Sequence, residues 1–201
     1  MLIKTNTEFI QHYFEDSSGL LGAYADRVAI AESNQDVIGL LEEATKTHTP
    51  VTVVGGATGV TGGCLAFGGI ILSTERLNNI GIITPINDKK AVLKVGAGTF
   101  VSDIKNYVLK NGWMYPPDPT EKNATIGGNI ATNASGGRGF KYGTTRDYIN
   151  AVEIVFPDGT FAFIKRGCIF ADKNNEIIIQ TNRGIKKIKL FKKNFPSRNF
   201  S

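Results

Sequence analysis

Two glycine-rich segments are the parts of this sequence whose residue types could do chemistry. Seven of the 23 glycines fall within residues 55–69 and six within residues 127–143. The first segment contains GGATGVTGG (residues 55–63), which has no charged residue and follows an apolar run. Glycine permits positive φ and close backbone approach, so the N–H groups of such a loop can point into one concavity and bind an anion without a lysine. A tight turn is the alternative, but one turn needs fewer glycines, so a phosphate-binding loop is favoured.

Two common phosphate-binding motifs are absent. The loop lacks the G-K-[ST] ending of a P-loop. Neither this loop nor Gly96-Ala-Gly98 has the G-x-G-x-x-G spacing that opens a helix after a strand. The sequence therefore does not support a P-loop NTPase or a Rossmann dinucleotide fold.

The second segment runs from PPDP (residues 116–119) to the glycine pair at 136–137 and combines prolines, paired glycines and small hydroxyl or amide side chains. Such a surface suits a flat ligand with polar edges that lies against backbone amides. We expect an irregular loop here. A compact structural loop is the alternative, but irregular stretches longer than about 12–15 residues are uncommon in compact domains unless functional.

The elements that must position these segments follow from apolar periodicity and turn signals. A helix is expected to start at Ser33, and Pro50 ends the pattern. Residues 1–18 are expected to form one polar-faced helix. Strands are expected at 51–54, 69–73, 80–86 and 91–95, the last two joined by a turn at 87–88. This helix–strand–loop–strand series indicates a mostly parallel first sheet.

The following part of the chain reads as a helix and then antiparallel strands. Val101, Ile104 and Val108 lie at helical spacing, and Asn111-Gly112 closes that helix. Strands are expected at 148–156 and 161–164 around a turn, and further hairpin strands at 176–181 and 185–191.

Several multi-residue motifs occur in order between about Tyr24 and Thr160: PVTVVGGATGVTGG, VGAGT, PPDPTEKNATIGGNIATNASGG and KYGTTRDYINAVEIVFPDGT. This series resembles the FAD-linked oxidases of the vanillyl-alcohol oxidase type, and within them the flavin subunits of glycolate oxidase and D-lactate dehydrogenase. The resemblance implies an α+β fold, a PCMH-type FAD-binding domain with two α/β subdomains at about 24–98 and 99–201. A small, mostly parallel sheet would be followed by a larger antiparallel or mixed sheet, truncated at its C-terminus and without a substrate domain.

The resemblance also implies which residues hold FAD. In the first segment they are Gly55, Gly56, Ala57, Thr58, Gly59 and Val60 for the pyrophosphate, with Gly62 and Gly63 completing the turn. Those lining the flavin and its ribityl chain are Pro117, Asp118, Thr125, Gly127, Gly128, Thr132, Asn133, Ser135, Gly136 and Gly143, with Ile154 as a weaker candidate.

The sequence departs from the family pattern at several positions. Val54 stands where the family usually has arginine, and Ala57 where it has a third glycine. The histidine and cysteine that carry covalent flavin in some relatives are absent, so the FAD is expected to be non-covalent. Cys64 is expected to be a packed side chain, and no metal site is expected.

The implied function is the FAD-binding portion of an oxidoreductase that oxidises a 2-hydroxy acid of the lactate, glycolate or 2-hydroxyglutarate class by hydride transfer to flavin N5. The catalytic residues are unknown and expected beyond residue 201, because His12 and His48 read as helix-surface positions. A non-catalytic flavin-binding subunit is one alternative. Another is an enzyme like UDP-N-acetylenolpyruvoylglucosamine reductase, against which the segment beginning PPDP argues.

Charge and composition bound the partners. The net charge of +5 rests on residues 177–201, which hold seven Lys/Arg and no acidic residue. A nucleic-acid-binding tail is possible on charge alone, but a solvated hairpin face is favoured, and no nucleic-acid partner is expected. Two cysteines, no long apolar run and no signal peptide indicate a cytoplasmic protein, or one peripheral to the inner membrane. An electron-acceptor protein or quinone and a homo-oligomer are left open.

Overall fold

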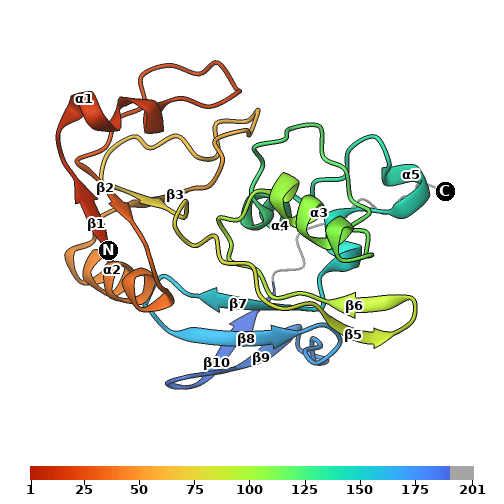
Figure 1. Ribbon diagram of the computed structural model, residues 1–201. Helices are drawn as coiled ribbons and strands as arrows, with labels where there is room; N and C mark the ends of the chain where they lie inside the picture. Colours follow the sequence, from red (N-terminus) through yellow and green to blue (C-terminus); the bar gives the residue numbers. More distant parts are fainter. Residues whose placement is uncertain (191–201) are drawn as a thin grey trace, which may run out of the picture.

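The computed structural model describes residues 1–190, without the side chains of Thr7 and Phe9. Figure 1 shows the four-stranded sheet with its helices at one end of the molecule and the helices of residues 101–142 with one β-hairpin at the other end. The hairpins of residues 151–165 and 176–189 run beneath them and reach toward the helix of the first sheet. The two glycine-rich segments lie between these two ends. The basic residues Lys192, Lys193 and Arg198 of the tail lie outside the described residues.

The first sheet has the order β1-β2-β4-β3, with β1 at Leu2–Lys4, β2 at Arg27–Ile30, β3 at Val51–Val54 and β4 at Ile70–Ser73. Strands β2, β3 and β4 are parallel, and β1 pairs antiparallel with β2. The predicted mostly parallel sheet is therefore confirmed. All four residues of β4 are buried, as expected for the central strand of a sheet covered on both faces.

Helix α2 (Asn34–Thr47) covers one face of this sheet. The Ser33 side chain accepts a hydrogen bond from the Asp36 backbone N–H at 3.2 Å, so the helix begins where the sequence predicted. Leu40 and Ala44 are buried against β2 and β4, in a cluster with Ala29, Ala31, Ile70 and Leu72. The helix ends at His48, whose φ of 52° is left-handed.

The N-terminal prediction is wrong. Residues 1–18 form β1, the short helix α1 (Thr7–Ile10) and the 3₁₀ helix η1 (Gln11–Phe14) instead of one polar-faced helix. Strand β2 was also not predicted. Leu2 pairs with Ile30 across the β1–β2 ladder, and a partner 28 positions away leaves no local pattern in the sequence.

A second core lies under helix α3 (Val101–Lys110). Ile104 and Val108 of α3 and Ile126 of helix α4 (Ile126–Thr132) are buried together, with Leu93 and Val95 packed against them. The hairpin β5–β6 is shorter than predicted, at Thr84–Asn87 and Lys90–Val92. Ile80 joins it only through an isolated bridge to Val95.

The remaining strands form antiparallel hairpins. Strand β7 (Ala151–Val155) pairs with β8 (Phe161–Lys165), and β9 (Glu176–Thr181) pairs with β10 (Gly184–Lys189). Strand β7 begins later than predicted, because Thr145–Tyr148 is the 3₁₀ helix η2. Phe191, at the end of the predicted last strand, lies outside the described residues.

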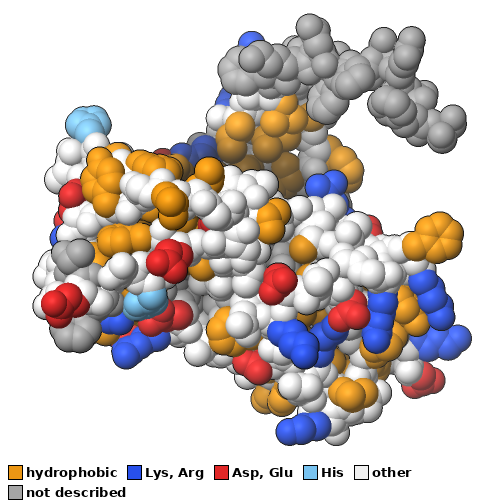
Figure 2. Space-filling model, turned by 90° about the horizontal axis from the view of Figure 1, so that it is seen from above, with side chains coloured by type: hydrophobic (Ala, Val, Ile, Leu, Met, Phe, Trp, Pro, Cys, Tyr) orange, Lys and Arg blue, Asp and Glu red, His pale blue; other side chains and the backbone are white. Residues whose placement is uncertain are grey.

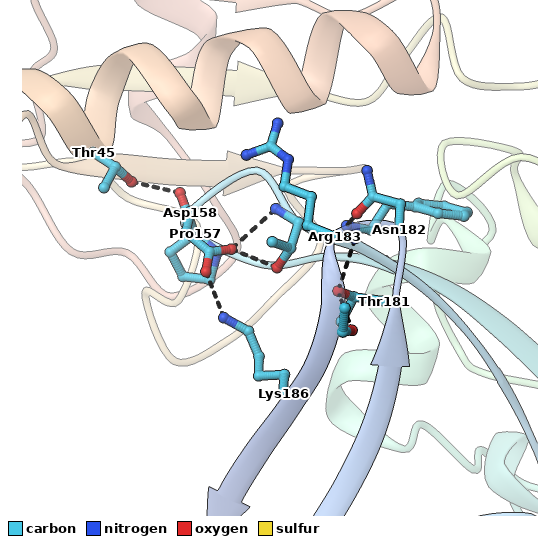
Figure 3. Close-up of polar contacts among 10 residues, drawn as sticks. Thr45, Pro157, Asp158, Thr181, Asn182, Arg183 and Lys186 are labelled. Carbon is cyan, nitrogen blue, oxygen red and sulfur yellow. Dashed lines mark hydrogen bonds and ion pairs between the residues drawn. The ribbon is translucent and has the colours of Figure 1, made fainter.

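The turn between β7 and β8 joins helix α2 to the last hairpin (Figure 3). The Thr45 hydroxyl donates to the Pro157 carbonyl oxygen at 2.5 Å. The Asp158 carboxylate accepts from the Lys186 ammonium at 2.5 Å and from the Thr160 hydroxyl at 2.6 Å. Arg183 also pairs with Glu42 of α2. Among residues 177–190, two of the four basic residues are therefore engaged with carboxylates.

We expect Gly98→Ala to destabilise the protein by about 1–3 kcal/mol or more, because the added Cβ would overlap the Thr74 carbonyl oxygen and the backbone would have to move. Gly39→Ala is the matched control, since Gly39 lies inside α2 with nothing near its Cβ position. That substitution should raise the free energy of unfolding by about 0.5–1 kcal/mol. Urea unfolding of both variants measures the two effects, and equal effects would contradict the packing at Gly98.

We expect Asp158→Asn to lower the free energy of unfolding by no more than about 1 kcal/mol at neutral pH, because the pair with Lys186 is partly exposed. The Lys186 ammonium and the Thr160 donors hold the pKa of the Asp158 carboxyl well below its ordinary value. Its stabilisation is therefore present above the ordinary carboxyl pKa and lost as pH falls through the lowered pKa. Urea unfolding as a function of pH should show wild type and variant converging in acid, whereas a constant difference would argue against the ion pair.

Candidate functional site

The two glycine-rich segments meet at the end of β3. A Cβ at Gly55 would overlap the Thr125 hydroxyl, and a Cβ at Gly56 would overlap the Asn123 carbonyl oxygen. Both glycines are thus required by contact between the first segment and the residues immediately before α4. The two segments begin about 60 residues apart in the sequence, at residues 55 and 116, and the fold brings them together.

The first segment contains two left-handed residues. Ala57 has a φ of 51° and Gly62 has a φ of 73°. Left-handed backbone costs an L-residue roughly 1–2 kcal/mol, which gives a physical reason for the family's preference for glycine at the position of Ala57. Ala57 is half-buried against the core that contains Val54 and Ile71, so its methyl group offsets part of that cost.

Two other glycines have no such requirement. Gly59 and Gly137 have no atom within 4 Å of the position where a Cβ would lie, and neither has a positive φ. Both are exposed, one in each segment. Because the protein's own packing leaves this space open, these positions allow a ligand to approach the backbone closely.

The second segment is not the irregular loop that was predicted. It contains α4, and the short helix α5 (Gly139–Tyr142) follows it. The Thr125 side chain caps α4 by accepting from the Gly128 N–H at 3.4 Å. The N–H groups of Ile126 and Gly127 donate to carbonyl oxygens of the VGAGT motif, at Thr99 (2.9 Å) and Ala97 (2.8 Å). These tertiary contacts and the burial of Ile126 stabilise a helix that two glycines disfavour.

The PPDP motif lies against the later part of the second segment. Asp118 and Gly136 form a parallel bridge, and a Cβ at Gly136 (φ 74°) would overlap the Asp118 carbonyl oxygen. The Asp118 carboxylate pairs with Lys105 of α3 and with the Arg138 Nε, the latter at 3.2 Å. Hydrogen bonding to Lys105 holds the pKa of the Asp118 carboxyl below its ordinary value. Neither cation was among the predicted site residues.

Other predicted residues are occupied by contacts within the protein. The Thr132 hydroxyl donates to the Gly128 carbonyl oxygen at 3.0 Å, and the Asn133 side chain accepts from the Arg146 N–H at 3.0 Å. Gly143 (φ 84°) faces the Asp147 carboxylate, which a Cβ would overlap. Half-buried Ile154 lies on β7, away from both segments in the chain, and pairs with Ala162. Contact of these residues with a ligand stays a prediction.

The surface around the site differs in character at its two ends (Figure 2). Lys and Arg side chains gather at the end that carries α3, α5 and the β5–β6 hairpin, where Arg138, Lys141 and Arg146 are exposed. Phe140 lies among these cations and is fully exposed. At the end with α1, hydrophobic side chains are exposed beside the first segment: Leu20, Leu21, Tyr24, Val60 and Phe67.

Both histidines lie on the surface, and Cys64 is a packed side chain, as the sequence predicted. His12 is exposed on η1 and His48 is exposed at the end of α2. The half-buried Cys64 packs against the first core and donates to Asp16 at 3.6 Å, and burial raises the pKa of its thiol. Among residues 1–190, no group of three His, Cys, Asp or Glu side chains could hold a metal ion. In the same part of the chain, no helix has the length and apolar character to cross a membrane.

An open, glycine-lined surface that presents backbone at the junction of two segments is the kind of site that binds a nucleotide cofactor. Residues 25–164 match the family described as "FAD binding domain". The chain belongs to this family, and its cofactor is FAD.

Several curated relatives are named as dehydrogenases or oxidases of lactate, glycolate or 2-hydroxyglutarate. The chain is 36% identical over 154 residues to a D-lactate dehydrogenase of Anaerostipes hadrus, an alignment that covers 76% of this chain and 32% of that protein. It is 32% identical over 149 residues to glycolate oxidase subunit GlcD of Bacillus subtilis, covering 73% and 31%. It is 32% identical over 159 residues to a D-2-hydroxyglutarate dehydrogenase of Xanthomonas citri, covering 78% and 33%. The chain thus spans about a third of the length of these relatives.

Solved structures confirm the fold. 6-Hydroxy-D-nicotine oxidase of Arthrobacter nicotinovorans superposes with a TM-score of 0.70 at 17% identity, over 94% of this chain and 42% of that one. A VAO-type flavoprotein of Myceliophthora thermophila superposes with a TM-score of 0.61 at 20% identity, over 73% and 27%. The resemblance to the vanillyl-alcohol oxidase type of flavoprotein, and the PCMH-type α+β fold class, are therefore confirmed.

The residues present fit FAD. Gly59 in the uncharged first segment and Gly137 in the second segment leave the space at their Cβ positions open, so a ligand can approach the backbone closely at both. Lys105 and Arg138 lie beside the second segment, where both pair with Asp118. Backbone N–H groups of a glycine-rich loop suit the pyrophosphate anion.

We expect Gly59→Ala to weaken FAD binding by about tenfold or more while leaving the stability of the FAD-free protein within about 0.5 kcal/mol, because the added methyl group occupies only space that the cofactor would use. Gly56→Ala is the contrast, since its Cβ overlaps the Asn123 backbone and should destabilise the protein itself. Flavin fluorescence titration and thermal unfolding separate the two effects. Unchanged affinity in Gly59→Ala would place the pyrophosphate elsewhere.

Proposed function

We propose that this chain is the FAD-binding portion of an oxidoreductase whose substrate is a 2-hydroxy acid of the lactate, glycolate or 2-hydroxyglutarate class. The observation that carries the proposal is the meeting of the two glycine-rich segments, Gly55 and Gly56 against Asn123–Thr125, in a chain whose relatives are 2-hydroxy-acid dehydrogenases. The specificity for CH–OH donors is part of this proposal.

When bound, FAD would supply the hydride acceptor for oxidation of the hydroxy acid at its α-carbon, which would yield the 2-oxo acid with release of the hydroxyl proton. This chain holds and orients the cofactor. Backbone N–H groups of residues 55–60 bind the pyrophosphate, and residues 125–137 line the ribityl chain and the ring. The binding is non-covalent, because no histidine or cysteine takes the positions that carry a covalent bond in some relatives. Cys64 is engaged with Asp16.

The charge beside the second segment supports an anionic substrate. Arg138, Lys141 and Arg146 are exposed on or beside α5, while the acidic Asp147 of this region is engaged with the Thr144 N–H at 2.7 Å. A cluster of cations raises the local concentration of carboxylates and speeds their encounter with the site. We therefore expect the carboxylate of the hydroxy acid to approach from the α5 side.

The proposal extends to the location of the catalytic groups and to the binding partners of the protein. We propose that the substrate-binding and proton-accepting groups lie in the two-thirds of the relatives' length that this chain does not cover. We also propose a division into subdomains at 24–98 and 99–201. An electron-acceptor protein or quinone, self-association, and a cytoplasmic or membrane-peripheral location are further proposals. A flavin-binding subunit without chemistry of its own is the second candidate.

The test is whether the purified protein binds FAD and whether the bound flavin is reduced by 2-hydroxy acids. We expect a visible flavin spectrum that survives desalting and moves to the supernatant on acid precipitation, as non-covalent binding requires. Under anaerobic conditions, D-lactate, glycolate or D-2-hydroxyglutarate should bleach the visible band if the chain and any partner supplied with it complete the site. The corresponding 2-oxo acids serve as controls.

The outcomes separate the two candidates. Flavin that is bound and stays oxidised with every hydroxy acid, while dithionite still reduces it, would support the non-catalytic subunit. Bleaching by a hydroxy acid of one class would identify the substrate class. A protein that retains no FAD would contradict both.

A further inference from the structure

We propose that Asp118 positions the flavin-lining part of the second segment through Lys105 and Arg138 and does not itself contact the flavin. This inference rests on the proposed site and revises the role expected for one of its residues. Lys105 and Arg138, which were not among the predicted site residues, then contribute to FAD binding indirectly, by ordering the segment that lines the cofactor.

The first step is the geometry of the carboxylate. One oxygen of Asp118, Oδ1, pairs with the Lys105 ammonium, and the other, Oδ2, lies 3.2 Å from the Arg138 Nε. Each oxygen is thus engaged by a different cation, from α3 on one side and from the turn before α5 on the other. FAD is an anion. It would not displace two cations in order to contact the Asp118 carboxylate, which is itself negative.

The second step is the backbone beside this carboxylate. Asp118 forms a parallel bridge with Gly136, and the absence of a side chain at Gly136 lets the two strands of chain approach closely. Pro117 is buried, and its ring fixes φ immediately before Asp118. The PPDP motif is therefore fixed to the protein on one side and to residues 136–138 on the other.

The ion pairs of Asp118 act locally and contribute little to global stability. The side chains of Lys105, Asp118 and Arg138 are 29%, 36% and 54% exposed, and exposed ion pairs add little to global stability. Their effect is instead local. They order residues 136–138 before the cofactor arrives, so the conformational entropy of that segment is not lost on binding. Open backbone at Gly137 lies between the two anchored positions, Gly136 and Arg138.

The test compares Asp118→Asn, the double variant Lys105→Met/Arg138→Met, and the triple variant that combines all three. Flavin fluorescence titration gives the dissociation constant for FAD, and thermal unfolding gives the stability of the FAD-free protein. Glu121→Gln is the matched control, because Glu121 is an exposed carboxylate in the same segment that forms no ion pair among residues 1–190. Visible circular dichroism of the FAD-saturated variants reports the surroundings of the ring.

We expect Asp118→Asn to weaken FAD binding about tenfold, the double variant to weaken it to a similar extent, and the triple variant to add less than about twofold. The dichroism of the bound flavin should change in the same three variants, while Glu121→Gln matches wild type. A purely structural role would lower the unfolding temperature without changing the dichroism at saturation, and that result would overturn the proposal.

Two further outcomes would overturn it. If Asp118→Asn loses as much affinity in the double-variant background as alone, Asp118 contacts the cofactor directly. If Asp118→Asn binds FAD as wild type does, the carboxylate has no positioning role. Should Asp118→Asn fail to fold, the single variants Lys105→Met and Arg138→Met give the same comparison with the carboxylate intact. Failure of the site itself is distinguishable, because wild type would then not bind FAD, or Gly59→Ala would bind as tightly as wild type.

Discussion

The fold of this protein depends on a close approach of backbone to backbone. Gly55 and Gly56 leave β3 directly against Asn123–Thr125, at a separation that admits no side chain. Because Thr125 also caps α4, and α4 is hydrogen-bonded to Ala97 and Thr99, this one contact connects the first sheet to the second core. The relative position of the two segments that bind FAD is therefore set by main-chain packing, which is stiffer than a contact between long side chains.

The surfaces on the two sides of this junction differ in charge. On one side the cations of α3 and α5 converge on the Asp118 carboxylate and leave Arg146 and Lys141 exposed. On the other side the surface beside the first segment is apolar. A dinucleotide that carries charge in its middle and an aromatic ring at each end suits such a surface.

Much of the fold could be predicted from the sequence where a local signal exists. Helix α2 follows from a capping serine and from Val37, Ile38, Leu41 and Ala44 at helical spacing. The parallel order follows from alternating helix and strand signals. Helix α4 could not be predicted, since Gly127 and Gly128 disfavour a helix and the contacts that stabilise it come from residues 97–99. Strand β1 and the ion pairs of Lys105 and Arg138 with Asp118 could not be predicted either, because in each case the partners are distant in the sequence. Family motifs indicated FAD because their residue types are constrained by the cofactor itself.

The glycines of the site fall into two groups with different evolutionary prospects. A side chain at Gly56, Gly98 or Gly136 would meet a carbonyl oxygen of the main chain, which every amino acid possesses. No second substitution elsewhere can make room for it, so a lineage that loses one of these glycines can recover only by reversion. At Gly55, which has no positive φ, the obstacle is the Thr125 hydroxyl, and a residue without that hydroxyl at position 125 would compensate. Paired changes should therefore be found among descendants at 55 and 125, and none that rescue position 56.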